Sequence, residues 1–153
     1  MIIVSGLPFS GTALIRQILK RGKLTELPLG EITANHNFSY INDFPENDKY
    51  TVIPSFFLKR LNDNHKIIFI ERNLEECFFL MEKRMKKEPH KDSFRLHFYN
   101  IKSFLKSKYT IFLNYSRVIE KPLDELKEIK PLISNFEKVI KVVDDILYRN
   151  VLY

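Results

Sequence analysis

The chain has 153 residues, of which 44% are hydrophobic and 29% charged, as is ordinary for one globular domain. Its single cysteine, Cys77, excludes an intrachain disulfide. The sequence shows no signal-peptide pattern and no apolar run near the ~20 residues of a membrane span. We therefore expect a cytoplasmic protein without a membrane partner. The net charge of +6 favours an anionic partner, and a phosphorylated small molecule fits better than nucleic acid because the basic residues are dispersed and no nucleic-acid motif occurs.

Short β-type runs alternate with helical stretches, which is typical of a parallel sheet covered by helices on both faces. Residues 2–5 predict a buried strand, and residues 11–20 predict a helix with one apolar face. From 22 to 48 the signal is weak, apart from a short element at 38–44. Such a long irregular segment is unusual unless it serves a site.

The pattern becomes regular again in the second part of the chain. The expected elements are a strand at 50–53, a helix near 55–61, a strand at 65–71, a helix from an Asn73 N-cap to about residue 87, a helix from Asp92 to about 107 and a strand at 109–113. Pro122 and Pro131 predict the first turns of two final helices. We therefore expect residues 1–153 to form one three-layer α/β/α domain with a mostly parallel sheet of about four or five strands.

The turn after the first strand reads Ser-Gly-Leu-Pro-Phe-Ser-Gly-Thr over residues 5–12. Gly6 and Gly11 have the spacing of a P-loop, in which small residues let backbone N–H groups converge on an anion at a helix N-terminus. A kinase or NTPase loop would continue with Lys and Ser or Thr, but Thr12 and Ala13 stand there, which argues against a nucleotide kinase-like enzyme. The alternative to an anion site is a turn that only joins strand to helix.

This loop resembles the Pro-x-Ser-Gly-Thr signature of sulfotransferases, and most closely that of a bacterial sulfotransferase-like family with a Ser-Gly-Leu-Pro-Arg-Ser-Gly-Thr loop. The resemblance implies a P-loop-type fold and binding of the co-substrate 3′-phosphoadenosine-5′-phosphosulfate (PAPS), with no metal. The loop residues that it assigns to PAPS are Gly6, Pro8, Phe9, Ser10, Gly11 and Thr12.

A second stretch is similar to the sulfotransferase strand that ends in an arginine for the 3′-phosphate of PAPS. Residues 66–72 repeat the strand and the arginine, which places Arg72 at the C-terminal edge of the predicted sheet, where open α/β folds bind ligands. The alternative role for Arg72 is a surface ion pair with Glu75 or Glu76.

Two weaker similarities lie further along the chain. Tyr115 follows the strand predicted at 109–113, where the family has a tyrosine. The segment 143–150 is similar to the family's closing Leu-Tyr-Arg, which adds Arg149 to the residues expected to bind the co-substrate.

Three positions depart from the family pattern. Phe9 replaces a Lys or Arg that stabilises charge on the leaving phosphate, a loss that typically costs about 10²–10³ in rate. Ala13 replaces a hydroxyl residue, and Leu80 replaces a serine that bonds the 3′-phosphate. The candidates for a substitute cation are Arg16, Lys83, Arg84 and Arg149.

Sulfuryl transfer also needs a group that accepts the acceptor's proton, commonly a histidine or a carboxylate. Glu31 and His36, in the irregular segment, are the candidates. His97 is interpreted as a residue at the edge of the core, and Cys77 as an inert packing residue.

Two functions remain open. The first is a sulfotransferase-like protein that binds PAPS and transfers its sulfuryl group to an unknown hydroxyl or amine acceptor. The alternative is a catalytically degenerate nucleotide- or anion-binding member of the same fold. Preferential binding of 3′-phosphoadenosine-5′-phosphate (PAP) over ATP would support both against a kinase-like function. The sequence predicts neither the acceptor nor the oligomeric state.

Overall fold

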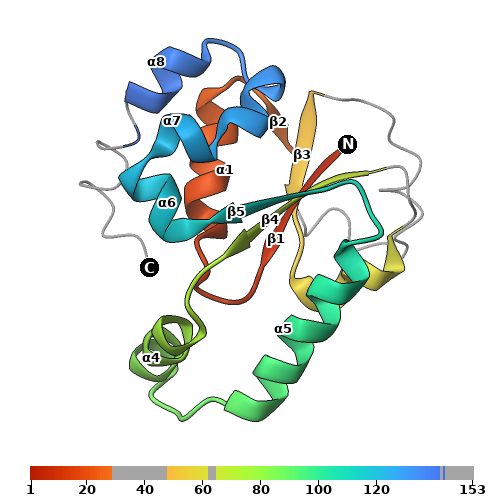
Figure 1. Ribbon diagram of the computed structural model, residues 1–153, viewed down its shortest axis with the longest axis vertical. Coiled ribbons are helices and arrows are strands. Elements are labelled where there is room, and N and C mark those ends of the chain that lie inside the picture. Colours follow the sequence, from red (N-terminus) through yellow and green to blue (C-terminus); the bar gives the residue numbers. More distant parts are fainter. Residues whose placement is uncertain (29–47, 62–64, 142, 144–153) are drawn as a thin grey trace.

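The computed structural model describes residues 1–28, 48–61, 65–141 and 143. Its centre is a five-stranded sheet in the order β2-β3-β1-β4-β5, with every neighbouring pair parallel (Figure 1). The strands are β1 (Ile2–Gly6), β2 (Thr25–Glu26), β3 (Lys49–Val52), β4 (Lys66–Glu71) and β5 (Thr110–Asn114). The expected α/β fold with a parallel sheet is confirmed.

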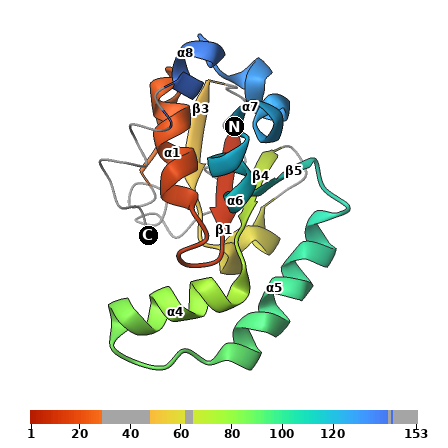
Figure 2. The ribbon, with the colours of Figure 1, turned by 60° about the vertical axis from the view of Figure 1, so that its left-hand side comes forward.

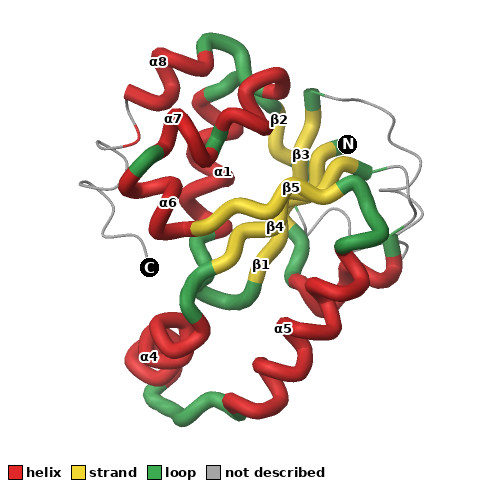
Figure 3. The backbone as a smooth tube through the Cα atoms, in the orientation of Figure 1, coloured by secondary structure: helices red, strands yellow, loops and turns green. Residues whose placement is uncertain are grey.

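Helices connect these strands and cover both faces of the sheet. They are α1 (Thr12–Arg21), α4 (Leu74–Met85), α5 (Lys91–Leu105), α6 (Tyr115–Glu120), α7 (Pro122–Glu125) and α8 (Phe136–Lys141), with the 3-10 helices η1 (Ser55–Arg60) and η2 (Lys127–Leu132). Helices α1, α6, α7 and α8 lie on one side of the strands and α5 on the other (Figures 2 and 3). No helix among the described residues is long and apolar enough to cross a membrane.

Alternate residues of the central strands point into two separate cores. Val4 and Ile68 belong to the core under α1 and α8, while Ile3 and Phe69 belong to the core under η1 and α5. A strand buried on both faces has to be apolar at every position, which explains the unbroken apolar runs of β1 and β4. The register pairs β1 with β4 from Ile2↔Lys66 to Gly6↔Ile70, so the two strands end at the same edge of the sheet.

Helix α4 extends beyond the carboxyl edge of the sheet, next to the β1–α1 loop (Figures 1 and 2). Asn73 caps it as expected, because its side-chain oxygen accepts hydrogen bonds from Glu75 N and Glu76 N at 2.9 and 3.3 Å. The helix contributes a small apolar cluster, against which Phe9 of the loop packs. The members of this α4 cluster are Cys77, Phe78 and Met81.

The structure differs from the sequence expectations in several connections. The helix expected near 55–61 is the 3-10 helix η1, and the two-residue strand β2 and the short helix α6 were not expected. Pro131 lies inside the 3-10 helix η2 rather than in a first turn, and α8 begins only at Phe136, after Asn135 at φ 56. Pro122 does start a helix. The element expected at 38–44 lies outside the described residues.

Candidate functional site

The loop between β1 and α1 turns the chain tightly at the carboxyl edge of the sheet. Ser10 N donates a hydrogen bond to Leu7 O at 3.0 Å, and Gly11 O accepts from Leu14 N at 3.0 Å in the first turn of α1. Gly11 is the N-cap and has φ +113, a conformation that favours glycine. The loop therefore delivers the chain directly into a helix N-terminus.

Both loop glycines are also required by close approach to their neighbours. A Cβ atom on Gly6 would lie against Ser10 Oγ and 2.7 Å from Ile70 O of β4. A Cβ atom on Gly11 would meet the ring of Tyr115, the residue that follows β5. The loop is thus packed against the ends of two neighbouring strands.

Several polar groups of the loop have no hydrogen-bond partner in the described part of the chain. They are the backbone N–H groups of Phe9, Gly11, Thr12 and Ala13, and the hydroxyl of Ser10, a residue that is 1% exposed. The first N–H groups of a helix have no partner within the helix, and together with the helix dipole they favour an anion. This loop has the donors that a phosphate or sulfate needs.

Arg72, at the end of β4, lies beside this loop. Its Nη1 donates to Phe9 O at 3.4 Å, and its Cζ lies 4.2 Å from the centre of the Tyr115 ring. Its Nε donates to Glu76 Oε2 at 2.8 Å, so the ion pair considered as the alternative role is present as well. The side chain is 15% exposed. A cation, the loop and an aromatic ring are therefore brought together from three parts of the sequence.

Phe9 serves the packing of α4. It has φ 65, a left-handed conformation that costs about 1–2 kcal/mol in a residue other than glycine. Its half-buried ring packs against the α4 cluster, which contains Cys77. Burial raises the pKa of the Cys77 thiol to about 11, so this thiol is protonated at neutral pH. The ring of Phe9 thus stabilises the position of α4 over the loop.

Arg16, on α1, forms an ion pair with Glu26 of β2. Its Nε lies 2.8 Å from the carboxylate of Glu26 on β2. Tyr50 completes the cluster, because its hydroxyl lies 3.3 Å from both Glu26 Oε2 and Arg16 O, and these two acceptors share its single proton. Within the described residues, the polar contacts of Arg16 are with Glu26 of β2 and Tyr50 of β3 rather than with the loop.

The Tyr50 hydroxyl gives a prediction about the dependence of stability on pH. Burial, followed by the charge of Glu26, raises the pKa of Tyr50 to about 12, above the usual value of about 10. The unfolded chain therefore loses this proton at lower pH, and the free energy of unfolding should fall as pH rises from about 10 towards 12. Urea unfolding over this range should show a shallower fall in Tyr50→Phe. An identical slope in both proteins would contradict this role.

The other residues expected at the site are placed as follows. Glu31, His36 and Arg149 lie outside the described residues. Lys83 and Arg84 lie in the exposed last turn of α4. Leu80 is buried, with 8% of its surface exposed.

A pair that the sequence did not suggest lies next to the loop. Ser55 Oγ and His97 Nε2 are 2.8 Å apart, although the residues are 42 positions apart in the chain. Ser55 also lines a cavity of about 270 Å³ between the loop and η1. Its lining includes Gly6, Leu7, Pro8 and Thr12 on the loop side and Ser55 and Phe56 of η1. Proline and serine after an apolar strand were the only local signal for this pair.

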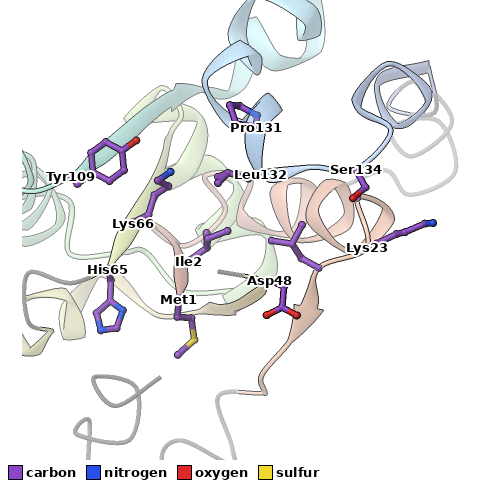
Figure 4. Close-up of a pocket in the computed structure, with 12 residues that line it drawn as sticks. Met1, Ile2, Lys23, Asp48, His65, Lys66, Tyr109, Pro131, Leu132 and Ser134 are labelled. Atoms are coloured by element: carbon purple, nitrogen blue, oxygen red, sulfur yellow. The ribbon is translucent and has the colours of Figure 1, made fainter. Parts of the chain in front are cut away.

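A different cavity, of about 590 Å³, lies at the amino ends of the strands, opposite the end that carries the loop (Figure 4). Met1, His65, Lys66 and Tyr109 line it, and they precede or begin β1, β4 and β5. Parallel α/β sheets bind ligands at the carboxyl ends of their strands. The loop edge therefore remains the candidate site.

No protein-family model and no curated protein matches the sequence. Among solved structures, mouse sulfotransferase SULT7A1 complexed with PAP is similar, with a TM-score of 0.62 and 15% identity. The match covers 94% of this chain and 62% of the mouse chain, so this chain spans less than two thirds of that protein's length. A sugar kinase from Janibacter sp. HTCC2649 has a TM-score of 0.46 and 12% identity, over 88% of this chain and 98% of the kinase. The described chain therefore has a sulfotransferase-like α/β fold.

Proposed function

We propose that residues 1–153 form a single sulfotransferase-like domain that binds PAPS and transfers its sulfuryl group to a hydroxyl or amine. The observation that carries the proposal is the position of Arg72, whose guanidinium lies 3.4 Å from Phe9 O of the anion-binding loop. The similarity to a mouse sulfotransferase crystallised with PAP supports the same nucleotide class. The loop sequence supports membership of the bacterial family with the Ser-Gly-Leu-Pro-Arg-Ser-Gly-Thr motif.

The loop and Arg72 would bind different phosphate groups of the nucleotide. The N–H groups of Phe9, Gly11 and Thr12 would hold the 5′-phosphosulfate at the start of α1. Arg72 keeps guanidinium N–H groups beyond those bonded to Glu76 and Phe9, and these would hold the 3′-phosphate. PAPS supplies an activated sulfuryl group, so the protein has to position the acceptor and stabilise charge on the departing phosphate.

We expect Arg72→Ala to weaken binding of PAP much more than binding of adenosine 5′-phosphate. A charge-assisted hydrogen bond contributes roughly 1.5–3 kcal/mol, which corresponds to about 10- to 100-fold in affinity. Titration calorimetry with the two nucleotides measures the difference directly. Lys130→Ala is a matched control, because it also removes a cation from an ion pair, here with Glu137 of α8, on elements that do not contain the loop or Arg72. Equal weakening of both nucleotides by Arg72→Ala would make Arg72 a structural residue and overturn the assignment.

A second function, nucleotide binding without transfer, is supported by Phe9. Its ring fills an apolar cluster where the family has a cation, so the loop itself offers no side-chain charge to the leaving phosphate. On this alternative, the natural protein binds PAP in preference to ATP and turns over no PAPS.

A further inference from the structure

The cavity of about 590 Å³ at the amino ends of the strands has no role in the proposed nucleotide site (Figure 4). Its volume lies within the usual range of small-molecule pockets, about 300–1,000 Å³. Residues that precede or begin β1, β3, β4 and β5 line it. The five residues of β1 separate this end of the sheet from the loop by roughly 15 Å, so a ligand here would not overlap a nucleotide bound at the loop.

Three apolar side chains, Ile2, Leu24 and Leu132, form what we call the apolar floor of this cavity. Ile2 and Leu24 are buried members of the core under α1 and α8, and the half-buried Leu132 packs against the same core. The floor is therefore held by the fold. It favours a ligand with an apolar body, because contact with these side chains would remove apolar surface from water.

Lys66 adds a positive charge at one wall of the cavity. Its Nζ lies 4.8 Å from the centre of the ring of Tyr109, a side chain that is 62% exposed. Figure 4 shows the two side chains next to each other on this wall. Among the described residues, no carboxylate forms an ion pair with Lys66. The ring thus holds an ammonium whose N–H donors can bind an anion.

The other ionisable side chains of the lining lie apart from Lys66 or carry no charge. Strand β1 lies between β4 and β3, so the backbone of Asp48, just before β3, is two strand spacings or roughly 10 Å from that of Lys66. Figure 4 shows the Asp48 carboxylate and the Lys23 ammonium separated from Lys66. Burial lowers the pKa of His65 below its usual value of about 6.5, so its ring is neutral at pH 7. Lys66 is therefore the side chain that offers positive charge at this wall.

We propose that this cavity is a second ligand site, which binds an aromatic monoanion. The carboxylate or sulfonate of such a ligand accepts hydrogen bonds from Lys66 Nζ, and its aromatic body lies on the apolar floor. The site does not depend on the proposed sulfuryl transfer. Nucleotide and aromatic anion bind at opposite ends of β1 and β4, so the protein can hold both at once.

Two probes with the same aromatic body, 2-naphthoate and its uncharged analogue 2-naphthamide, test the proposal in the full chain. Titration calorimetry should show about 10-fold tighter binding of 2-naphthoate, because only its carboxylate forms a charge-assisted hydrogen bond with Lys66. Lys66→Met should weaken 2-naphthoate about 10-fold and leave 2-naphthamide within about 3-fold. Lys23→Met is the matched control, because it removes the same charge from the lining at a distance from Lys66. It should keep the affinity for 2-naphthoate within about 3-fold, since solvent screens the more distant charge.

Leu132→Ala tests the apolar floor and should weaken both probes by a similar factor, about 4-fold for each CH₂ group that loses contact. Saturating PAP should leave the binding of 2-naphthoate unchanged. The proposal would be overturned by equal affinity of the natural protein for the two probes, by equal losses in Lys66→Met and Lys23→Met, or by displacement of 2-naphthoate by PAP. Absence of 2-naphthoate binding would overturn it as well. Binding of 2-naphthoate through Lys66 in a protein that does not bind PAP would support this site and contradict only the proposed nucleotide site.

Discussion

Replacing Gly11 with valine should abolish PAP binding while the sheet stays folded. Valine is β-branched and is strongly disfavoured at φ +113. Its Cβ would also collide with the ring of Tyr115, which stacks under Arg72. Such a strained conformation costs about 1–3 kcal/mol, so the loop should change conformation and move its N–H groups away from the anion.

Gly22→Val is the matched control for this variant. Gly22 follows α1 at φ −75, and a Cβ there would lie 2.5 Å from Ile133 Cγ2, far along the chain from the loop. This variant should lose stability and keep its affinity for PAP. Thermal unfolding measures the stability that each variant loses to its steric clash, and titration calorimetry measures its affinity for PAP. Together the two measurements separate a general loss of stability from loss of the nucleotide site. A folded Gly11→Val protein with natural affinity for PAP would exclude the loop as the nucleotide site.

The sequence was sufficient to predict the parts of the fold that depend on local periodicity. Apolar runs identified β1 and β4, because a central parallel strand is buried on both faces. Parallel strands place their carboxyl ends together, so Arg72 was expected at the same edge of the sheet as the loop. Its contact with the loop, from Nη1 to Phe9 O at 3.4 Å, depends on side-chain packing and was not part of that expectation.

The sequence was insufficient where a contact depends on long-range packing. Strand β2 has only two residues, too few for a periodic pattern, so the Glu26 that pairs with Arg16 had no signal. The expectation that Arg16 could serve as the substitute cation did not take this partner into account. His97 was interpreted as a residue at the edge of the core, and its half-buried ring on α5 fits that description. Its contact with Ser55 joins two elements that no sequence pattern relates.

The loop combines features that favour opposite functions. Its free N–H groups and the adjacent Arg72 favour binding of a phosphorylated nucleotide. The carbonyl of Phe9 accepts a hydrogen bond from Arg72, and its ring packs against the α4 cluster. Phe9 therefore has two structural contacts, one through its backbone and one through its side chain. A cation introduced at this one position therefore tests whether catalysis is limited by charge alone. Leu80→Ser, which would restore the family's serine for the 3′-phosphate, is a less suitable variant. Leu80 is buried, so its replacement by the smaller serine would open a cavity.

Phe9→Arg should raise turnover of PAPS about 10²–10³-fold over the natural protein, because the guanidinium would stabilise charge on the leaving phosphate. The φ of 65 costs arginine no more than it costs phenylalanine, and position 9 is only half-buried, next to the exposed Pro8. Removing the ring from the α4 cluster should lower stability, so Phe9→Met, which removes the ring without adding charge, is the control. Release of PAP and transfer to 4-nitrophenol, measured with the three proteins at equal folded concentration, separate the two effects.

Equal turnover in Phe9→Arg and Phe9→Met would mean that charge at this position does not limit the reaction. Rapid turnover by the natural protein would likewise require a cation from elsewhere, with Arg149, Lys83 and Arg84 as the next residues to replace.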